Sequence, residues 1–341
     1  MNLKAAPSLA SKAGMPAQPP LLQLSDLAVS FPAEDAGGDL KVVDGISLRL
    51  EKGKTLGLVG ESGCGKSITA LALLGLVPEP GRVTGGRIMF GGTDLRQLTD
   101  ADMRQVRGNR IALIFQEPAP ALNPVYTVGA QIAEAYRLHN ETTKNEARHR
   151  AIALLQRVGI ADAVQRADAY PHQLSGGMRQ RCMIAMALIC TPEMLIADEP
   201  TTALDTTIQA QILELLMDIQ DEFGMAILFI SHNLATISAV ADDILVMYAG
   251  RAAEQAPAEE LIAAPNHPYT RGLLDTLPSR ARRGEKLPSL AGSVGREDLR
   301  LPGCRFANRC ELADAKCRSA IPPLIKLANG RHSACFKAEE L

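Results

Sequence analysis

Eight consecutive residues have the types and spacing that bind a phosphate chain. The stretch Gly60–Ser67 reads GESGCGKS and matches G-x-x-x-x-G-K-[ST] at every fixed position. Its glycines let the backbone approach phosphate oxygens, and a following helix directs unpaired N–H groups at the same point. Lys66 would place an ammonium on the β- and γ-phosphates, and the Ser67 hydroxyl would be a ligand of Mg²⁺. The flanking residues predict a strand at Thr55–Val59 and a helix at Ile68–Leu74.

Further polar side chains follow apolar runs that read as buried parallel strands. They are Gln116 after Ile111–Phe115, Asp198 and Glu199 after Met194–Ala197, and His232 after Met225–Ile230. Because α/β sheets place ligand contacts at the carboxyl ends of their strands, we expect these groups at one edge. There Asp198 can hold Mg²⁺, usually through its water, and Glu199 can orient or deprotonate an attacking water. The alternative is a solvated acidic turn, which the apolar strand before Asp198 makes unattractive.

Two features allow both a functional and a structural explanation. Phe31 could stack on a purine base, although an aromatic residue at a strand end can equally be packed. Ser175 precedes Gly176 and Gly177 at a predicted helix start, where the hydroxyl would cap the helix and the glycines would form a second backbone anion site. In isolation, an ordinary capped helix with a Gly turn is the favoured explanation of Ser175.

The cysteines are concentrated near the C-terminus. Four of the seven fall after residue 303, namely Cys304, Cys310, Cys317 and Cys335. In a cytosolic chain such a group argues for metal rather than disulfides. Four thiolates suit tetrahedral zinc and a cubane iron–sulfur cluster equally well by ligand count, and His332 could substitute as a ligand. Unligated surface cysteines are the remaining explanation, but four exposed thiols would be a reactivity liability.

The composition argues against several classes of function. The 341 residues carry 36 Lys and Arg against 38 Asp and Glu, so the net charge of −2 gives no electrostatic argument for nucleic acid. Trp is absent, which removes stacking platforms of single-strand binders. No apolar run approaches the ~18–20 residues that cross a bilayer, and the start of the chain lacks a signal-peptide core. We expect a cytoplasmic protein with a flexible tail at residues 1–20.

The pattern between the motifs predicts an α/β fold. Leu22–Phe31 and Ile46–Leu50 alternate between apolar and polar residues, as strands of a partly exposed antiparallel sheet do. From about Pro118 to Thr191 the pattern becomes helical and indicates an insert. The expected helices are Val128–His139, Lys144–Val158, Gly176–Ile189 and Ile208–Glu222, and further expected strands are Arg87–Phe90 and Asp243–Tyr248. Beyond about Ala264 the pattern loosens into Pro, Gly and Arg.

Together, these motifs resemble those of the nucleotide-binding subunits of ATP-binding cassette (ABC) transporters. The resemblance covers residues ~20–255 and rests on several motifs in the family's order and approximate spacing. They are GESGCGKS, Gln116, LSGGMRQR at Leu174–Arg181, LIADEP at Leu195–Pro200, Ala203-Leu204-Asp205 and Ser231-His232. The runs PALNP after Gln116, PTTALD and NHPYTRGLL, with the four-cysteine tail, are similar to the oligopeptide, dipeptide and nickel importer branch.

The resemblance implies a role for each matching position. The catalytic residues would be Glu199 as general base, His232, Gln116 and Lys66, and Mg²⁺ would be held by Ser67, Gln116 and Asp198. ATP would be bound by Phe31, Gly60, Glu61, Ser62, Gly63, Cys64, Gly65, Lys66, Ser67 and Ile68. The opposite subunit's ATP would be contacted by Ser175, Gly176 and Gly177, with Asp205 at the dimer interface. One complete site would therefore need two chains.

The implied fold is a P-loop NTPase core of the RecA-like α/β type with an antiparallel β subdomain. The nucleotide-binding domain would span residues 21–255, with its helical insert subdomain at about 118–191. A small cysteine-containing C-terminal extension would span residues 256–341. In this branch the extension resembles domains that hold a [4Fe-4S] cluster, which favours iron–sulfur over zinc. Met178 replaces the Gln of the general family, a form associated with one of two ATPase subunits, and so favours pairing with a different ATPase chain.

The expected function is ATP hydrolysis that powers uptake of di- and oligopeptides or a related solute. ATP and Mg²⁺ would be cofactors. The partners would be a second ATPase subunit, two membrane permease subunits and an extracytoplasmic solute-binding protein, without nucleic acid. The chain would be peripheral, at the cytoplasmic face of the inner (cell) membrane. The alternatives are import of nickel, glutathione or another non-peptide solute, a soluble ABC ATPase acting on ribosomes or DNA, and a redox-responsive regulator.

Overall fold

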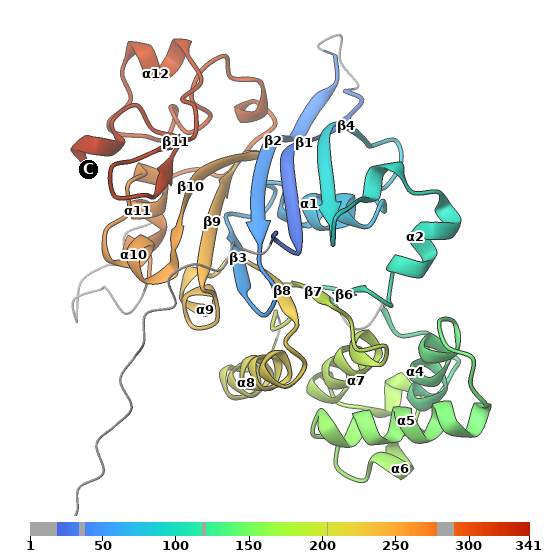
Figure 1. The fold of residues 1–341 in the computed structure, drawn as a ribbon. Coiled ribbons are helices and arrows are strands. Elements are labelled where there is room, and N and C mark those ends of the chain that lie inside the picture. The colour runs from blue at the N-terminus through green and yellow to red at the C-terminus, as the bar shows by residue number, and fades with distance from the viewer. Residues whose placement is uncertain (1–18, 34–37, 118–120, 203, 278–289) are drawn as a thin grey trace, which may run out of the picture.

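The computed structural model describes residues 19–33, 38–117, 121–202, 204–277 and 290–341 (Figure 1). Most of the expected tail at residues 1–20 lies outside the described residues, as do Pro120 of PALNP and Ala203 of PTTALD. Within the described part of the chain, no helix is both long enough and apolar enough to cross a membrane.

An eight-stranded sheet forms the centre of the molecule, with parallel strands in the order β9-β3-β8-β7-β6. These strands are β3 (Thr55–Val59), β6 (Ile111–Ile114), β7 (Met194–Asp198), β8 (Ala226–Ser231) and β9 (Asp243–Tyr248). Both faces of the central parallel strands are buried, because alternate side chains of one strand enter two different apolar cores. Phe229 packs with Leu215 of helix α8 (Thr206–Phe223) on one side, whereas Leu228 belongs to the other core.

A four-stranded antiparallel sheet covers that other core. Its order is β2-β1-β4-β5, with β1 (Leu22–Phe31), β2 (Leu40–Leu50), β4 (Arg82–Phe90) and β5 (Thr93–Asp94). The predicted antiparallel strands are confirmed, since β1 pairs antiparallel with both β2 and β4. Helix α1 (Lys66–Leu73) contributes Ala70 and Leu73 to the same core. The 3₁₀ helix η1 (Leu95–Gln97) and helix α2 (Asp100–Val106) follow this sheet in the chain.

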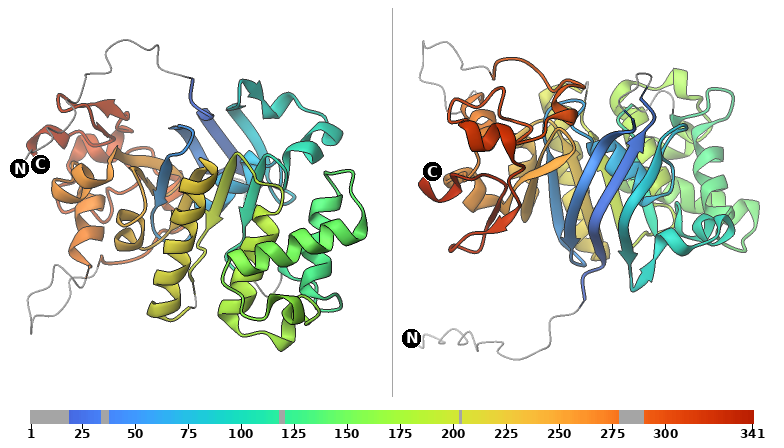
Figure 2. Two further views of the ribbon diagram at one scale, coloured as in Figure 1. Left: turned by 60° about the horizontal axis from the view of Figure 1, so that its bottom comes forward. Right: turned by 90° about the horizontal axis from the view of Figure 1, so that it is seen from above.

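The helices expected between about Pro118 and Thr191 are present, and their buried side chains share a core with one face of the central sheet. This helical group contains α4 (Val128–Arg137), α5 (Lys144–Arg157), α6 (Ala163–Arg166), the 3₁₀ helix η2 (Pro171–Gln173) and α7 (Gly176–Leu188). Threonine and serine hydroxyls cap α4, α5 and α7, which explains why the helices start where the sequence predicts. Figures 1 and 2 show this group at the opposite end of the molecule from the C-terminal extension.

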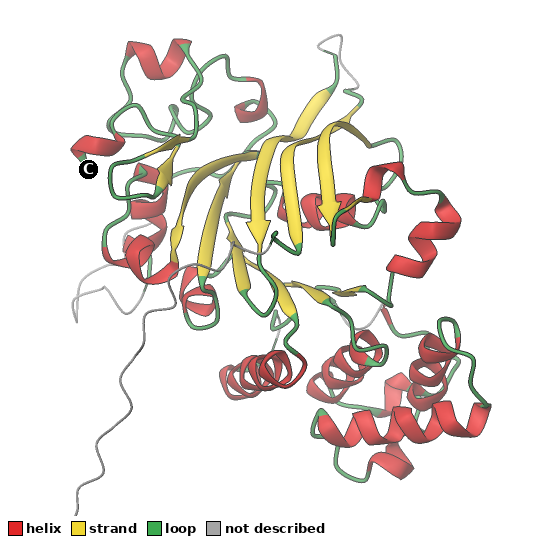
Figure 3. Cartoon of the chain, viewed as in Figure 1, coloured by secondary structure: helices red, strands yellow, loops and turns green. Residues whose placement is uncertain are grey.

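The C-terminal extension is more regular than its sequence pattern indicates (Figure 3). Helix α9 (Leu234–Ser238) lies between β8 and β9, and β10 (Arg251–Pro257) leads from β9 into the extension. The extension then contains α10 (Ala258–Ala263), α11 (Pro268–Asp275), η4 (Asp298–Arg300), α12 (Ala315–Ser319), β11 (Ile325–Lys326), β12 (His332–Ser333) and η5 (Ala338–Glu340). Several short elements therefore form where the sequence pattern loosens beyond Ala264. Helix α11 forms because Pro268 suits its first turn and the ring of His267 accepts the Tyr269 N–H as a cap. Strand β12 pairs with β10 and so joins the extension to the central sheet.

Candidate nucleotide site

The loop Gly60–Gly65 connects β3 to α1, and its shape requires glycine. Gly63 and Gly65 have φ values of 80° and 103°, in the left-handed region that disfavours a side chain. Gly60 is needed for space instead, because a Cβ there would collide with the Met247 carbonyl oxygen and Cys64 Sγ. The backbone therefore folds as the phosphate-binding pattern predicts.

Lys66 lies across this loop rather than pointing into solvent. It is buried, and its Nζ donates to the carbonyl oxygens of Gly60 and Glu61 at 2.7 and 3.0 Å. Phosphate oxygens can replace these carbonyls as acceptors, since an ammonium has three donors and little rearrangement is needed. The Cys64 side chain, by contrast, is buried in the core, so only its backbone could face a nucleotide.

Asp198, the last residue of β7, has the chemistry of a magnesium ligand. Burial raises the pKa of its carboxyl, and the Ser67 hydroxyl that bonds to it and the charge of Lys66 lower the pKa by less. Its Oδ1 is buried and has no hydrogen-bond partner within the described residues. An unpaired buried carboxylate oxygen beside a hydroxyl is a hard oxygen donor set, which fits Mg²⁺. Ser67 and Asp198 are therefore brought together as the sequence predicts.

Three polar groups converge on one oxygen of Glu199. Its Oε2 accepts from Gln116 Nε2 at 3.1 Å and from Thr202 Oγ1 at 2.8 Å, and lies 3.0 Å from His232 Nδ1. The backbone of Glu199 has a φ of 47°, and its N–H donates to the Ile230 carbonyl of β8. A non-glycine residue in this conformation costs ~1–2 kcal/mol, so the surrounding structure holds it there. A carboxylate fixed in this way can orient or deprotonate a water.

This arrangement confirms that the polar groups after three strands meet at one edge, and it adds Thr202 to the contacts of Glu199. Gln116, Glu199 and His232 meet at one edge of the sheet, as expected from the ends of β6, β7 and β8. Thr202 was not predicted to contact Glu199, although the PTTALD run that contains it was noted. A cleft at this edge is lined by Ser67, Phe115, Gln116 and Asp198, among others.

Phe31 and the predicted dimer residues lie elsewhere. The Phe31 ring lies directly against Gly81 and packs on the core of the antiparallel sheet, while its stacking on a base stays a prediction. Ser175 caps α7 by accepting the Met178 N–H at 3.3 Å, and Asp205 caps α8 through the N–H groups of two residues. Neither Ser175 nor Asp205 lines the cleft beside Ser67.

The four C-terminal cysteines share one pocket. Cys304, Cys310, Cys317 and Cys335 all line it, and none forms a disulfide. Burial, together with the proximity of the other three thiols, raises the pKa of the Cys304 thiol to about 11, although a backbone hydrogen bond at Phe306 opposes the rise. Among the described residues, no group of three or more His, Cys, Asp or Glu side chains is arranged to hold a single metal ion.

The histidine beside these cysteines differs from the predicted one. His332 lies on β12 opposite Gln255 and does not line the pocket, which argues against its role as a substitute ligand. His267 lines it instead. Burial lowers the pKa of His267 to about 4, and its Nδ1 accepts the Tyr269 N–H at 3.1 Å. The sequence signal for His267 was the NHPYTRGLL run, to which no contact had been assigned.

Comparisons with known proteins agree with this geometry. A family model described as "ABC transporter" matches residues 43–202, and one described as "Oligopeptide/dipeptide transporter, C-terminal region" matches residues 253–317. A Sinorhizobium fredii protein named "Probable peptide ABC transporter ATP-binding protein y4tR" is 47% identical over 94% of this chain and 96% of its own length. The Escherichia coli "Dipeptide transport ATP-binding protein DppD" is 48% identical over 92% of this chain and 96% of its own length.

Solved structures show the same fold. The dimeric "MJ0796, a Bacterial ABC Transporter Cassette" aligns with a TM-score of 0.61 and 24% identity, over 70% of this chain and 98% of its own. A Clostridium perfringens protein, cbiO1, described as part of the ABC transporter complex cbiONQ, aligns with a TM-score of 0.61 and 26% identity. That alignment covers 72% of this chain and 92% of cbiO1.

The phosphate-loop geometry predicts the effect of a single methyl group. Gly65→Ala should weaken Mg²⁺·ATP binding by at least about tenfold. The alanine would be strained by the left-handed backbone at this position, and its Cβ would lie 2.7 Å from the Val42 carbonyl oxygen. Gly92→Ala is the matched control, since Gly92 has a φ of 82° but no atom within 4 Å of its Cβ position. Calorimetric titration measures both affinities. Wild-type affinity in Gly65→Ala would contradict this account of the loop.

Proposed function

Because the chain belongs to the ATPase subunits of ABC transporters that carry the oligopeptide/dipeptide transporter C-terminal region, we propose that it powers the import of small peptides. The observation that carries the proposal is the presence of both family regions in one chain. Relatives named for peptide and dipeptide transport are nearly half identical to it over more than nine-tenths of its length. The cargo would be di- and oligopeptides.

In this proposal the loop Gly60–Ser67 and Lys66 bind the β- and γ-phosphates of ATP. Backbone N–H groups at the start of α1 and the Lys66 ammonium offset the negative charge of the phosphates. Ser67, Asp198 and Gln116 would hold Mg²⁺, and the unpartnered Oδ1 of Asp198 supports this assignment. When bound, Mg²⁺ would neutralise charge that develops on the phosphate oxygens.

Glu199 is the proposed general base. Its Oε2 is engaged by Gln116, Thr202 and His232, so we assign Oε1 to the water that attacks the γ-phosphate in line. His232 is exposed enough to reach the γ-phosphate, since 58% of its side chain is accessible. The three contacts fix the direction of the carboxylate, which is the positioning that phosphoryl transfer depends on.

The second wall of the ATP site would come from another ATPase chain. Ser175, Gly176 and Gly177 form the N-terminus of the 13-residue helix α7, where backbone N–H groups can bind a phosphate. Ser175 and Gly176 are exposed, and no atom lies within 4 Å of the position a Gly176 Cβ would take. Asp205, at the start of α8, would lie at the same interface. Met178 favours a different chain as the partner.

The remaining partners would be two permease subunits and an extracytoplasmic solute-binding protein. The segment after Gln116 is the proposed permease contact, and its exposed apolar side chains support it: Val125 and Tyr126 are 69% and 57% accessible, and Phe115, just before Gln116, is 45% accessible. The chain would then lie at the cytoplasmic face of the inner membrane, held there by the permeases.

The shared cysteine pocket is proposed to hold a [4Fe-4S] cluster. The support for it is that Cys304, Cys310, Cys317 and Cys335 line one pocket, which matches the four thiolate ligands of a cubane. Among the described residues no group of three or more side chains is arranged to hold a single metal ion, so a mononuclear zinc site has no support there. The cluster would cross-link three segments of the extension: the one that carries Cys304 and Cys310, helix α12 with Cys317, and the residues after β12 with Cys335.

Glu199→Gln tests the assignment of the base. The variant should still bind ATP but hydrolyse it at least about 100-fold more slowly, because an amide cannot take a proton from water. Glu214→Gln removes the same charge from an exposed position on α8 and should hydrolyse ATP at the wild-type rate. Steady-state phosphate release measures both variants. Turnover of Glu199→Gln near that of wild type would remove Glu199 as the base.

Cys304→Ser tests the cluster. Anaerobically purified wild-type protein should contain iron, sulfide and visible absorbance, and the variant should lose most of each. Cys190→Ser, in the helical group away from the pocket, should keep them. Unchanged iron in Cys304→Ser, or zinc in place of iron in the wild type, would overturn the proposal.

The cargo is tested with the reconstituted transporter and its solute-binding protein. Di- and oligopeptides should stimulate ATP hydrolysis several-fold, because a loaded binding protein favours closure of the two ATPase chains. Stimulation by nickel or glutathione but not by peptides would support the alternative cargo. Co-purification with ribosomes and no response to any solute would support the soluble ATPase instead.

A further inference from the structure

Glu61, the second residue of the phosphate loop, is fixed by three contacts. Its N–H donates to the Tyr269 hydroxyl at 2.9 Å, and its carbonyl oxygen accepts from Lys66 Nζ at 3.0 Å. Its two carboxylate oxygens accept from Arg309 at 2.6 and 2.8 Å. Two of these three contacts come from the C-terminal extension, so the extension determines how this part of the loop is held.

Arg309 is itself held firmly. Its side chain is 8% accessible, and its Nε donates to the Ala291 carbonyl at 2.7 Å. The guanidinium lies 5.6 and 5.8 Å from the ring centroids of Tyr248 and Phe306. A bidentate arginine–carboxylate pair in such surroundings has a defined geometry, and breaking it leaves an uncompensated charge.

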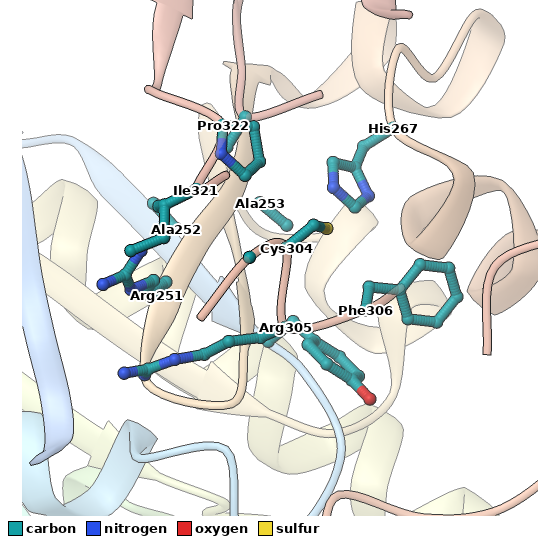
Figure 4. Close-up of a pocket in the computed structure, with 12 residues that line it drawn as sticks. Arg251, Ala252, Ala253, His267, Cys304, Arg305, Phe306, Ile321 and Pro322 are labelled. Atoms are coloured by element: carbon teal, nitrogen blue, oxygen red, sulfur yellow. The ribbon is translucent and has the colours of Figure 1, made fainter. Parts of the chain in front are cut away.

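Arg305, four residues before Arg309, contacts two residues that lie beside the phosphate loop, Asp44 and Ala249. Arg305 Nη2 donates to Asp44 Oδ2 of β2 at 2.8 Å, and Nη1 donates to the Ala249 carbonyl. The Asp44 N–H donates to the Gly250 carbonyl, and the Gly250 N–H donates to the carbonyl of Cys64 in the loop. Figure 4 shows the Arg305 side chain extended away from Cys304, on the side where Arg251 lies. The segment of residues 304–310 therefore contacts the phosphate loop directly, through Arg309, and indirectly, through Arg305 and its partner Asp44.

We propose that Arg309 is a positioning residue for ATP binding, which acts through Glu61 to hold the phosphate loop in its binding conformation. Lys66 Nζ donates to the carbonyl oxygens of Gly60 and Glu61, and in the proposed function on which this inference rests it exchanges them for phosphate oxygens when ATP binds. A loop that is already fixed at Glu61 loses less conformational entropy when ATP binds. Arg309 also neutralises a carboxylate that would otherwise stand unpaired beside an incoming triphosphate.

The two arginines that support the phosphate loop are sequence neighbours of two pocket cysteines. Arg305 directly follows Cys304 and Arg309 directly precedes Cys310, so both arginines are presented by the part of the chain that carries two of the pocket's thiols. The cysteine-bearing segment thus supports the phosphate loop. The inference itself rests on the Arg309–Glu61 contact and not on what the cysteines bind.

The test uses the full-length chain for ATP affinity, and the chain assembled with its partner ATPase subunit for turnover. Arg309→Ala should raise the KM for ATP and the Kd for Mg²⁺·AMPPNP about tenfold, with kcat changed by no more than about twofold. Arg309→Lys should recover part of the affinity, since lysine keeps the charge but not the bidentate geometry. Glu61→Gln/Arg309→Ala should bind more tightly than Arg309→Ala, because the double variant no longer leaves an unpaired carboxylate. Arg296→Ala, an exposed arginine near the segment, is the control.

A structural role alone predicts a different pattern. If Arg309 only stabilised the fold, Arg309→Ala would lower kcat in proportion to the unfolded fraction and leave KM and Kd at wild-type values, which would overturn the proposal. If Arg309→Ala and the double variant bound Mg²⁺·AMPPNP equally well, the unpaired Glu61 carboxylate would not weaken binding, and that part of the proposal would be wrong. If Arg309→Ala does not fold, the same measurements are made on Arg309→Lys and Glu61→Gln. A wild-type Kd for Mg²⁺·AMPPNP in both variants would overturn the proposal.

Discussion

The parallel pairing of β3, β8 and β7 is the constraint on which the nucleotide site depends. Val59 pairs with Ser231 and Ile230 with Asp198, so the residues that follow each strand emerge at the same edge. The phosphate loop, His232 and Glu199 are therefore neighbours although they are far apart in the sequence. Burial of both faces of these strands leaves their carboxyl ends as the place where polar groups can meet a ligand.

The antiparallel sheet and the C-terminal extension approach the phosphate loop from outside this edge. A Cβ at Gly65 would meet the backbone of β2, and Gly250, after β9, bonds to the loop at Cys64. The extension adds Tyr269 and Arg309 at Glu61. The loop is thus enclosed by three parts of the chain, and its conformation depends on how they pack together as well as on its own glycines.

The sequence predicted the features that short stretches of chain determine by themselves. The GESGCGKS pattern specifies its own loop, the apolar runs specify buried strands, and Ser175 specifies a helix start through its cap. The Tyr269 and Arg309 contacts with Glu61 were not predicted, because they join residues 208 and 248 positions apart and no local pattern marks either partner. His267 was missed for a related reason: the cysteines whose pocket it lines lie far from it in the sequence. The roles given to Ser175 and Asp205 need a second chain and stay predictions.

An experimental structure of the chain with Mg²⁺ and an ATP analogue is the most direct test of the central claim, that one sheet edge assembles the nucleotide site. The account predicts Mg²⁺ about 2.0–2.1 Å from Ser67 Oγ, with Asp198 on the ion or its water. It also predicts Lys66 Nζ on phosphate oxygens and Glu61 still paired with Arg309. A nucleotide bound with Lys66 still on the Gly60 and Glu61 carbonyls, and with Mg²⁺ away from Ser67 and Asp198, would contradict it.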